Sequence, residues 1–446
     1  MKKVSFHTLG CKVNAYETEA MQQRMEEAGY TVVPFGDDSD VCIINTCTVT
    51  NIADRKSRQM IHRAKKANPE AVIVAVGCYV ESGLKDCEKD EAIDIVVGNN
   101  RKAEIVSIVE NYIEEKNEAK RKLLKTNMSD MSAKSVDYED MPLTRVENHT
   151  RAYIKIQDGC NQFCTYCIIP YTRGRIRSRD KASVIGEVTR LAKEGYKEIV
   201  LTGIHLSSYG KDLNNGESLL TILQSLNEID GVERIRLGSL EPRIITEEFL
   251  DAISKLDKVC PHFHLSLQSG SEGVLKRMNR HYTPDEYYEK CELIRKYYPD
   301  AALTTDIIAG FPQETDEEWK ETVAFAKKVN FFEIHVFKYS MRNGTRAAAM
   351  PGQVGENIKT IRSDELIEAA SNMSGAFRER FIGRFAPVLF EEKITADNGR
   401  EYFVGHTREY IKVALPAEEV KDDISGAILM VNLKILFGDM IEAKLV

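Results

Sequence analysis

Residues 158–179 read DGCNQFCTYCIIPYTRGRIRSR, and Cys160, Cys164 and Cys167 in this stretch form a CxxxCxxC motif directly after a β-strand pattern. Three thiolates on one short loop can hold three corners of a 4Fe-4S cubane and leave the fourth iron without a protein ligand. A structural zinc site is the alternative, but zinc takes four closed ligands, and no partner cysteine or histidine follows at finger spacing. We therefore predict an iron-sulfur cluster on this loop.

The residues around the motif alternate between strand and helix patterns. Six apolar runs, each followed by a helical pattern, predict six βα units within residues 149–375. The strands are expected at residues 153–157, 198–201, 234–240, 262–269, 303–311 and 332–339. Because a complete barrel has eight units, we predict a partial (β/α)6 barrel in a chain of the α/β class.

Residues 1–115 show the same rhythm, with near-continuous apolar runs that are typical of a parallel sheet covered on both faces. Cys11, Cys47 and Cys78 each come just past the end of such a strand. Taken singly, each is a candidate for a small buried apolar residue. Together they lie where the carboxyl ends of parallel strands gather ligands, so we predict a second cluster with three thiolate ligands. The other four cysteines are expected in the core: Cys42, Cys87, Cys260 and Cys291.

The remaining segments have a different character. Residues 116–148 are rich in lysine and then polar, which indicates a linker. Residues 376–446 carry five closely spaced strand patterns, which predict a small antiparallel β-barrel.

Composition excludes several classes of protein. The 446 residues are 43% hydrophobic and 29% charged, as expected for an ordinary globular protein of several domains. We find no signal peptide or membrane-spanning run, so we expect a cytoplasmic protein without a membrane partner. The net charge of −8 argues against nucleic-acid binding through bulk charge, although local basic patches remain possible. Motifs for nucleotide hydrolysis and serine-type catalysis are missing from the sequence.

A CxxxCxxC motif after the first strand of a six-unit barrel resembles the radical S-adenosylmethionine (SAM) superfamily. The stretches TLGCKVNAYETE (8–19), INTCTVTNIADRKSRQ (44–59) and VGCY (76–79), with the terminal barrel, make the chain similar to the methylthiotransferases. Within that family it most resembles the group that acts on N6-threonylcarbamoyladenosine in tRNA.

The resemblance implies insertion of a methylthio group at C2 of that nucleoside, at tRNA position 37 beside the anticodon. SAM would be both the methyl donor and the source of a 5′-deoxyadenosyl radical. Two 4Fe-4S clusters are implied, a radical cluster on Cys160, Cys164 and Cys167 and an auxiliary cluster on Cys11, Cys47 and Cys78. An RNA-binding TRAM domain at the C-terminus and a low-potential electron donor, such as flavodoxin or ferredoxin, are implied as well.

Four further residues are candidates for SAM contacts. Tyr166 lies inside the cysteine loop, where members of the family place an aromatic ring against the adenine of SAM. Gly203, Gln268 and Ile308 lie at or near the carboxyl ends of expected barrel strands, the face where ligands gather. Packing of the loop and the barrel is the alternative role for each.

Two features point to RNA. Arg173, Arg175, Arg177 and Arg179 alternate, so an extended segment would project all four to one side, toward phosphates or simply toward solvent. Lys12 follows Cys11 where the isopentenyladenosine group typically has glutamine. It can pair with the threonylcarbamoyl carboxylate, or it is a solvated lysine.

Two rival functions stay open. One is a methylthiotransferase acting on isopentenyladenosine in tRNA or on a ribosomal-protein aspartate. The other is a non-catalytic, metal-stabilised RNA-binding protein.

Overall fold

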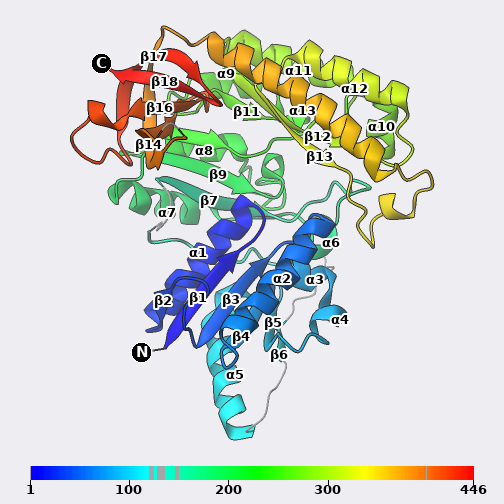
Figure 1. Cartoon of the computed structure of the whole chain (residues 1–446), viewed down its shortest axis with the longest axis vertical. Helices are drawn as coiled ribbons and strands as arrows, with labels where there is room; N and C mark the ends of the chain where they lie inside the picture. The colour runs from blue at the N-terminus through cyan, green and yellow to red at the C-terminus, as the bar shows by residue number, and fades with distance from the viewer. Residues whose placement is uncertain (1, 120–124, 128–135, 146–149, 398) are drawn as a thin grey trace.

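A computed structural model describes residues 2–119, 125–127, 136–145, 150–397 and 399–446. Figure 1 shows an N-terminal α/β domain in blue, a central partial barrel in green to yellow, and a terminal β-barrel in orange to red. The predicted α/β class is confirmed, and so are the parallel-sheet domain, the partial barrel and the small terminal β-barrel. Within the described ranges, every helix is too short or too polar to cross a membrane.

The N-terminal domain is a parallel sheet with strand order β2-β1-β3-β4-β5-β6 in the described residues. Its strands are β1 (Lys3–Thr8), β2 (Thr31–Val33), β3 (Val41–Thr46), β4 (Val72–Gly77), β5 (Ile95–Val97) and β6 (Lys125–Asn127). Its helices are α1 (Lys12–Glu27), α2 (Asn51–Ala67), α3 (Cys78–Ser82), α4 (Leu84–Cys87) and α5 (Ile105–Ala119). Every residue of β3 and β4 is buried, as expected for central parallel strands covered on both faces.

The segment predicted as a linker contains structure. Helix α5 continues to Ala119, and β6 pairs in parallel with β5, so this segment contributes a strand to the sheet. Met141 and Leu143 are buried in the main core, and the Leu143 backbone N–H donates to Glu187 at 2.6 Å. Residues 120–124, 128–135 and 146–149 lie outside the described residues. The lysine-rich, polar composition of this segment did not predict that β6 forms the edge strand of the sheet. Nor did it predict that Met141 and Leu143 pack into the main core.

The central barrel has the six predicted parallel strands. They are β7 (Arg151–Asp158), β9 (Glu198–Gly203), β10 (Arg234–Leu237), β11 (His262–His264), β12 (Ala302–Ala309) and β13 (Glu333–Lys338). β10-β9-β7 and β11-β12-β13 form two arcs, which parallel bridges such as Leu240↔Leu265 connect. A short strand that we did not predict, β8 (Arg177–Ser178), pairs antiparallel with β7.

Helices cover the outside of the barrel (Figure 1). They are α7 (Lys181–Lys193), α8 (Leu219–Asn227), α9 (Glu247–Ser254), α10 (Glu272–Arg277), α11 (Pro284–Tyr297), α12 (Asp316–Val329) and α13 (Glu356–Glu379). The short helix α6 (Ile169–Thr172) follows the cysteine loop and lies against α3 of the N-terminal domain. Sequence signals explain their starts, since α11 and α12 begin with capping boxes at Thr283 and Thr315. Helix α13 runs through residue 375, where we expected the domain to end.

The terminal domain is the predicted five-stranded barrel. Its strands, β14 (Phe385–Thr395), β15 (Glu401–His406), β16 (Lys412–Pro416), β17 (Ile428–Phe437) and β18 (Met440–Leu445), close in the order β14-β15-β16-β18-β17. Most pairings are antiparallel, as predicted, but β16 and β18 pair in parallel. Tyr410 stacks on His262, the first residue of β11, with ring centroids 5.0 Å apart. The terminal barrel therefore docks at the amino ends of the central strands, opposite the cysteine loop.

Candidate functional site

The first cysteine site lies on the loop that connects β7 to α6. Gly159, with φ +69°, turns the chain at the end of β7 so closely that a Cβ there would lie 1.8 Å from the Arg175 carbonyl oxygen. Cys160, Cys164 and Cys167 follow, and all three line one cavity of about 170 Å³ at the carboxyl end of the barrel. The structure thus brings the predicted trio to one place.

Burial and one arginine set the electrostatics of this site. Burial raises the pKa of the Cys160 thiol to about 11 and that of the Cys167 thiol to about 12. Arg280, in the loop after α10, donates from Nη1 to the Cys164 Sγ at 3.3 Å. The guanidinium thus places a charged hydrogen-bond donor directly on this sulfur. No local sequence pattern marks Arg280, because 116 residues separate it from Cys164.

The second cysteine site is assembled from three strand ends. Cys11 follows β1, Cys47 follows β3 and Cys78 follows β4, and these strands are neighbours in the sheet. Gly10, with φ +103°, permits the close approach, because a Cβ on it would lie 2.9 Å from the Cys47 Sγ. Burial raises the pKa of the Cys47 thiol to about 11, and the charges of Cys78 and Cys11 add to that rise. The second predicted trio is also brought together.

An arginine from the barrel reaches this second site. Arg173 donates from Nε to the Cys78 Sγ at 3.3 Å and from Nη2 to the Asn14 Oδ1 at 2.8 Å. The same guanidinium pairs with Glu17 at 2.9 Å and with Asp158 at 3.1 Å. Arg173 is fully buried, so its charge acts on Cys78 with little screening by water. One side chain therefore joins the two domains and contacts a cysteine of the N-terminal one.

This burial corrects the predicted row of arginines. Gly174, with φ +70°, interrupts the extended conformation, so the four side chains do not project to one side. Arg173 and Arg177 turn inward to Asp158, and Arg179 is buried against Glu187. The predicted phosphate contacts are therefore wrong for these three, because their charges are already paired inside the protein. Of the four, Arg175 alone is exposed, with its guanidinium 4.7 Å from the Phe163 ring centroid.

A cavity of about 230 Å³ lies between the N-terminal domain and the barrel. Val49 and Thr50, just past Cys47, line it on one side, and Tyr166, Asp306 and Ile308 line it on the other. Tyr166 and Gln268 also line the cavity of the first cysteine site, so the two spaces adjoin.

Arg342 fixes the two walls of this cavity to each other. It donates from Nη2 to the Thr48 Oγ1 at 2.6 Å and from Nη1 to the Asn51 Oδ1 at 2.8 Å, and it pairs with Asp54 at 2.7 Å. No local sequence pattern marks this arginine, because its partners lie almost 300 residues away.

The candidate SAM contacts differ in their placement. Tyr166, Gln268 and Ile308 line the cavities, and Gln268 is held at φ +74° by a backbone bond from its N–H to the Asp306 carbonyl oxygen at 2.8 Å. Gly203 ends β9, and its neighbour Ile204 lines the first cavity.

Lys12, the candidate contact for the substrate carboxylate, begins α1, and its ammonium lies 5.7 Å from the Tyr153 ring centroid of the barrel. These roles stay predictions.

Comparison with known proteins decides the family. Residues 154–326 match the Radical SAM superfamily, and residues 3–98 match the family described as "Uncharacterized protein family UPF0004". The threonylcarbamoyladenosine tRNA methylthiotransferase MtaB of Bacillus subtilis (strain 168) is 41% identical over 97% of this chain and 94% of its own length. The chain belongs to the methylthiotransferase family of radical SAM enzymes.

Other relatives of the methylthiotransferase carry two kinds of name. MtaB of Aquifex aeolicus (strain VF5) is 39% identical over 89% of this chain and 95% of the relative. The tRNA-2-methylthio-N(6)-dimethylallyladenosine synthase of Clostridium botulinum (strain Loch Maree / Type A3) is 35% identical over 96% of this chain and 93% of the relative.

Among solved structures, the radical SAM methyltransferase TsrM of Kitasatospora setae, with cobalamin and a [4Fe-4S] cluster bound, is similar in fold. The TM-score is 0.56 at 14% sequence identity, over 76% of this chain and 75% of that chain. As a radical SAM enzyme, the methylthiotransferase uses SAM together with an iron-sulfur cluster.

Proposed function

We propose that this methylthiotransferase inserts a methylthio group at C2 of N6-threonylcarbamoyladenosine, beside the anticodon of tRNA, and that it holds two 4Fe-4S clusters. The observation that carries the proposal is the pair of cysteine trios, one at the strand ends of the N-terminal domain and one at the carboxyl end of the barrel. Residues just past Cys47 line the interdomain cavity, which adjoins the cavity of the barrel trio. Cys160, Cys164 and Cys167 would hold the radical cluster, and Cys11, Cys47 and Cys78 the auxiliary cluster. Each trio has three thiols and one arginine N–H on a sulfur, a donor set that fits a cubane.

Two clusters answer a chemical requirement. The C2 hydrogen of adenine is not acidic and C2 bears no leaving group, so acid-base or nucleophilic side chains cannot replace the hydrogen by sulfur. When bound, the radical cluster with SAM supplies a 5′-deoxyadenosyl radical, and the auxiliary cluster supplies the sulfur. The protein positions the target carbon between the two sites and excludes water from them. Arg342 serves this purpose by holding the two cavity walls together.

The surface beside the cavity supports binding of tRNA. Helix α2 starts at Asn51, four residues after Cys47, and its outer face is basic. The exposed residues of this face are Arg55, Lys56, Arg58, Arg63 and Lys66. Two exposed apolar side chains that line the cavity, Val49 and Phe337, can contact an unstacked base. A net charge of −8 makes such a local patch necessary for phosphate contacts.

The choice of nucleoside rests on two observations. The MtaB relatives of Bacillus subtilis and Aquifex aeolicus are 41% and 39% identical, against 35% for the dimethylallyladenosine synthase of Clostridium botulinum. Lys12, directly after Cys11, offers a cation to the threonylcarbamoyl carboxylate, and an isopentenyl group has nothing for this cation to bind.

A low-potential electron donor, such as a flavodoxin or ferredoxin, is the proposed protein partner. Reductive cleavage of SAM consumes an electron for each radical, and the described residues offer no third cluster-type cysteine trio as an internal source. The donor must therefore come from outside the chain.

Mass spectrometry of tRNA nucleosides tests the proposal. A strain that lacks the gene should lose the methylthio form of N6-threonylcarbamoyladenosine and regain it with the wild-type chain. Lys12→Met should lower kcat/KM for this tRNA by about tenfold, the effect of losing roughly 1.4 kcal/mol of binding. SAM cleavage without tRNA is the control, because it does not use the nucleoside.

Three outcomes would contradict the proposal. If the strain lost methylthio isopentenyladenosine instead, the substrate would be isopentenyladenosine in tRNA. If a ribosomal-protein aspartate were left unmodified instead, that aspartate would be the substrate. A colourless, zinc-loaded protein after anaerobic reconstitution, in place of about eight irons per chain, would favour a non-catalytic RNA-binding protein.

A further inference from the structure

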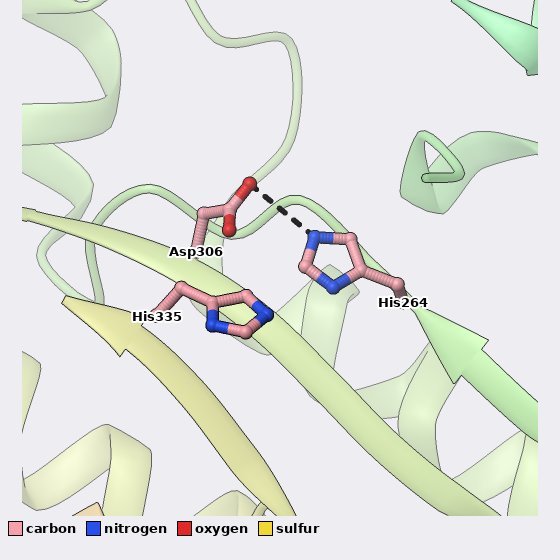
Figure 2. A group of neighbouring side chains, drawn as sticks. All are labelled: His264, Asp306 and His335. Carbon is pink, nitrogen blue, oxygen red and sulfur yellow. Dashed lines mark ion pairs between the residues drawn. The ribbon is translucent and has the colours of Figure 1, made fainter. Parts of the chain in front are cut away.

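A group of two histidines and one aspartate lies on three neighbouring strands inside the central barrel. His264 ends β11, Asp306 lies in β12, and His335 lies in β13 directly opposite Asp306. One ligand atom from each of the three lies within 4.8 Å of the others. Figure 2 shows the three side chains converging on one point in front of the sheet. None of the cysteine sites includes these residues.

The hydrogen bonds around His264 leave one of its nitrogens without a partner. Its Nδ1 lies 3.0 Å from the Thr304 Oγ1, which can accept the Nδ1–H bond. Its Nε2 is buried, makes no hydrogen bond to any described atom, and points at the Asp306 Oδ2 from 3.3 Å. A threonine that accepts from Nδ1 fixes the tautomer in which Nε2 carries a lone pair, as in metal-ligating histidines. In this tautomer two electron-rich atoms face each other, and a cation between them would stabilise the pair; a protonated His264 would instead pair directly with Asp306.

The spacing fits a metal ion as that cation. Two ligands at 2.0–2.1 Å from a tetrahedral ion are about 3.3 Å apart, the separation found between His264 Nε2 and Asp306 Oδ2. His335 supplies a third donor from the neighbouring strand. Two imidazoles and a carboxylate are donors that zinc and iron(II) accept, with coordination positions left open.

We propose that His264, Asp306 and His335 bind one divalent first-row transition-metal ion, such as Zn²⁺. Asp306 also lines the interdomain cavity, which would place the ion beside it. Because the donors are nitrogen and oxygen, this ion is separate from both iron-sulfur clusters and from any zinc on the cysteines.

Zinc binding to the reconstituted holoenzyme tests the proposal, because the clusters then occupy the cysteines. After equilibrium dialysis against ZnCl₂, we expect one zinc per chain by elemental analysis, in addition to the iron. X-ray absorption at the zinc edge should show nitrogen and oxygen neighbours at about 2.0–2.1 Å with imidazole scattering. Sulfur neighbours at about 2.3 Å would place the zinc on cysteines and overturn the proposal.

Variants assign the ligands. His335→Gln changes an exposed side chain and His264→Gln a partly buried one. Each should weaken zinc binding by at least about 100-fold, the upper end of the effect of losing a partner that only orients a ligand. His62→Gln is the matched control, since His62 contacts Asp90 at 2.9 Å on the surface without a second histidine. Iron content and circular dichroism verify folding. Unchanged zinc affinity in the folded His335→Gln protein, or no zinc uptake by the wild type, would overturn the proposal and leave a protonated His264–Asp306 ion pair.

Discussion

The two cysteine sites have the same number of thiols but are built in different ways. Cys160, Cys164 and Cys167 come from one loop, so any fold that forms this loop brings them together. Cys11, Cys47 and Cys78 are spread over almost seventy residues and meet only because β1, β3 and β4 are parallel neighbours. The first site is a local property of the chain, and the second is a property of the sheet.

The arginines of the two sites differ in a related way. Arg280 reaches Cys164 within the barrel, whereas Arg173 reaches Cys78 across the domain boundary. Glu17 pairs with Arg173, with Lys155 and with Lys102, so α1 is tied to the barrel by buried ion pairs. The arginine contact of the second site therefore depends on the docking of two domains, and that of the first site does not.

The largest expected effect separates the two sites by function. Cys160→Ala should abolish reductive cleavage of SAM, because the radical cluster loses a ligand. Cys11→Ala should preserve cleavage to 5′-deoxyadenosine and abolish methylthio insertion. Each variant should lose about four of about eight irons. Product analysis by liquid chromatography checks both reactions, and a Cys42→Ala protein, altered at a buried core cysteine, serves as the control. Loss of cleavage in Cys11→Ala would show that the sites are not separable.

A second prediction concerns pH during cluster assembly. Burial raises the pKa of Cys160 and of Cys47 to about 11 each, so these thiols are protonated at neutral pH. Ligands must lose their protons to bind metal, and the thiolate fraction grows about tenfold per pH unit below the pKa. Anaerobic reconstitution followed by absorbance should therefore be faster at pH 8.5 than at pH 7. Proteins in which one trio is replaced by alanine should show a similar pH dependence of the assembly rate at the other trio. An assembly rate that does not change with pH at one site would contradict the prediction.

The smallest effect concerns the arginines. Arg173→Gln removes an N–H···S bond and a cation, so the reduction potential of the auxiliary cluster should fall by about 60 mV, the equivalent of roughly 1.4 kcal/mol. Arg280→Gln should lower the potential of the radical cluster instead. Redox titration by electron paramagnetic resonance, in proteins that carry one trio each, checks this. Arg175→Gln, at an exposed neighbour of Arg173, should shift neither potential. Equal shifts of both clusters in Arg173→Gln would contradict the assignment.

Much of the fold could be predicted from local patterns. The barrel strands β9, β12 and β13 begin and end within two residues of their predicted bounds, because continuous apolar runs and turn residues mark them directly. The strand β6 was missed, because its three residues, Lys125–Asn127, carry no apolar signal and pair only at the sheet edge. The row of arginines was misread, because alternation predicts one face only if the segment stays extended, and Gly174 breaks it.

The sequence by itself determined the cysteine loop, the order of strands and helices, and the positions of Cys11, Cys47 and Cys78 after their strands, since these depend on neighbouring residues. Only the tertiary structure decided that Arg173 and Arg280 reach the sulfurs, that Arg342 closes the interdomain cavity, and that His264, Asp306 and His335 converge. The physical reason is that such contacts join residues far apart in the chain. Their positions follow from how the sheets pair and the domains pack, which no local pattern encodes.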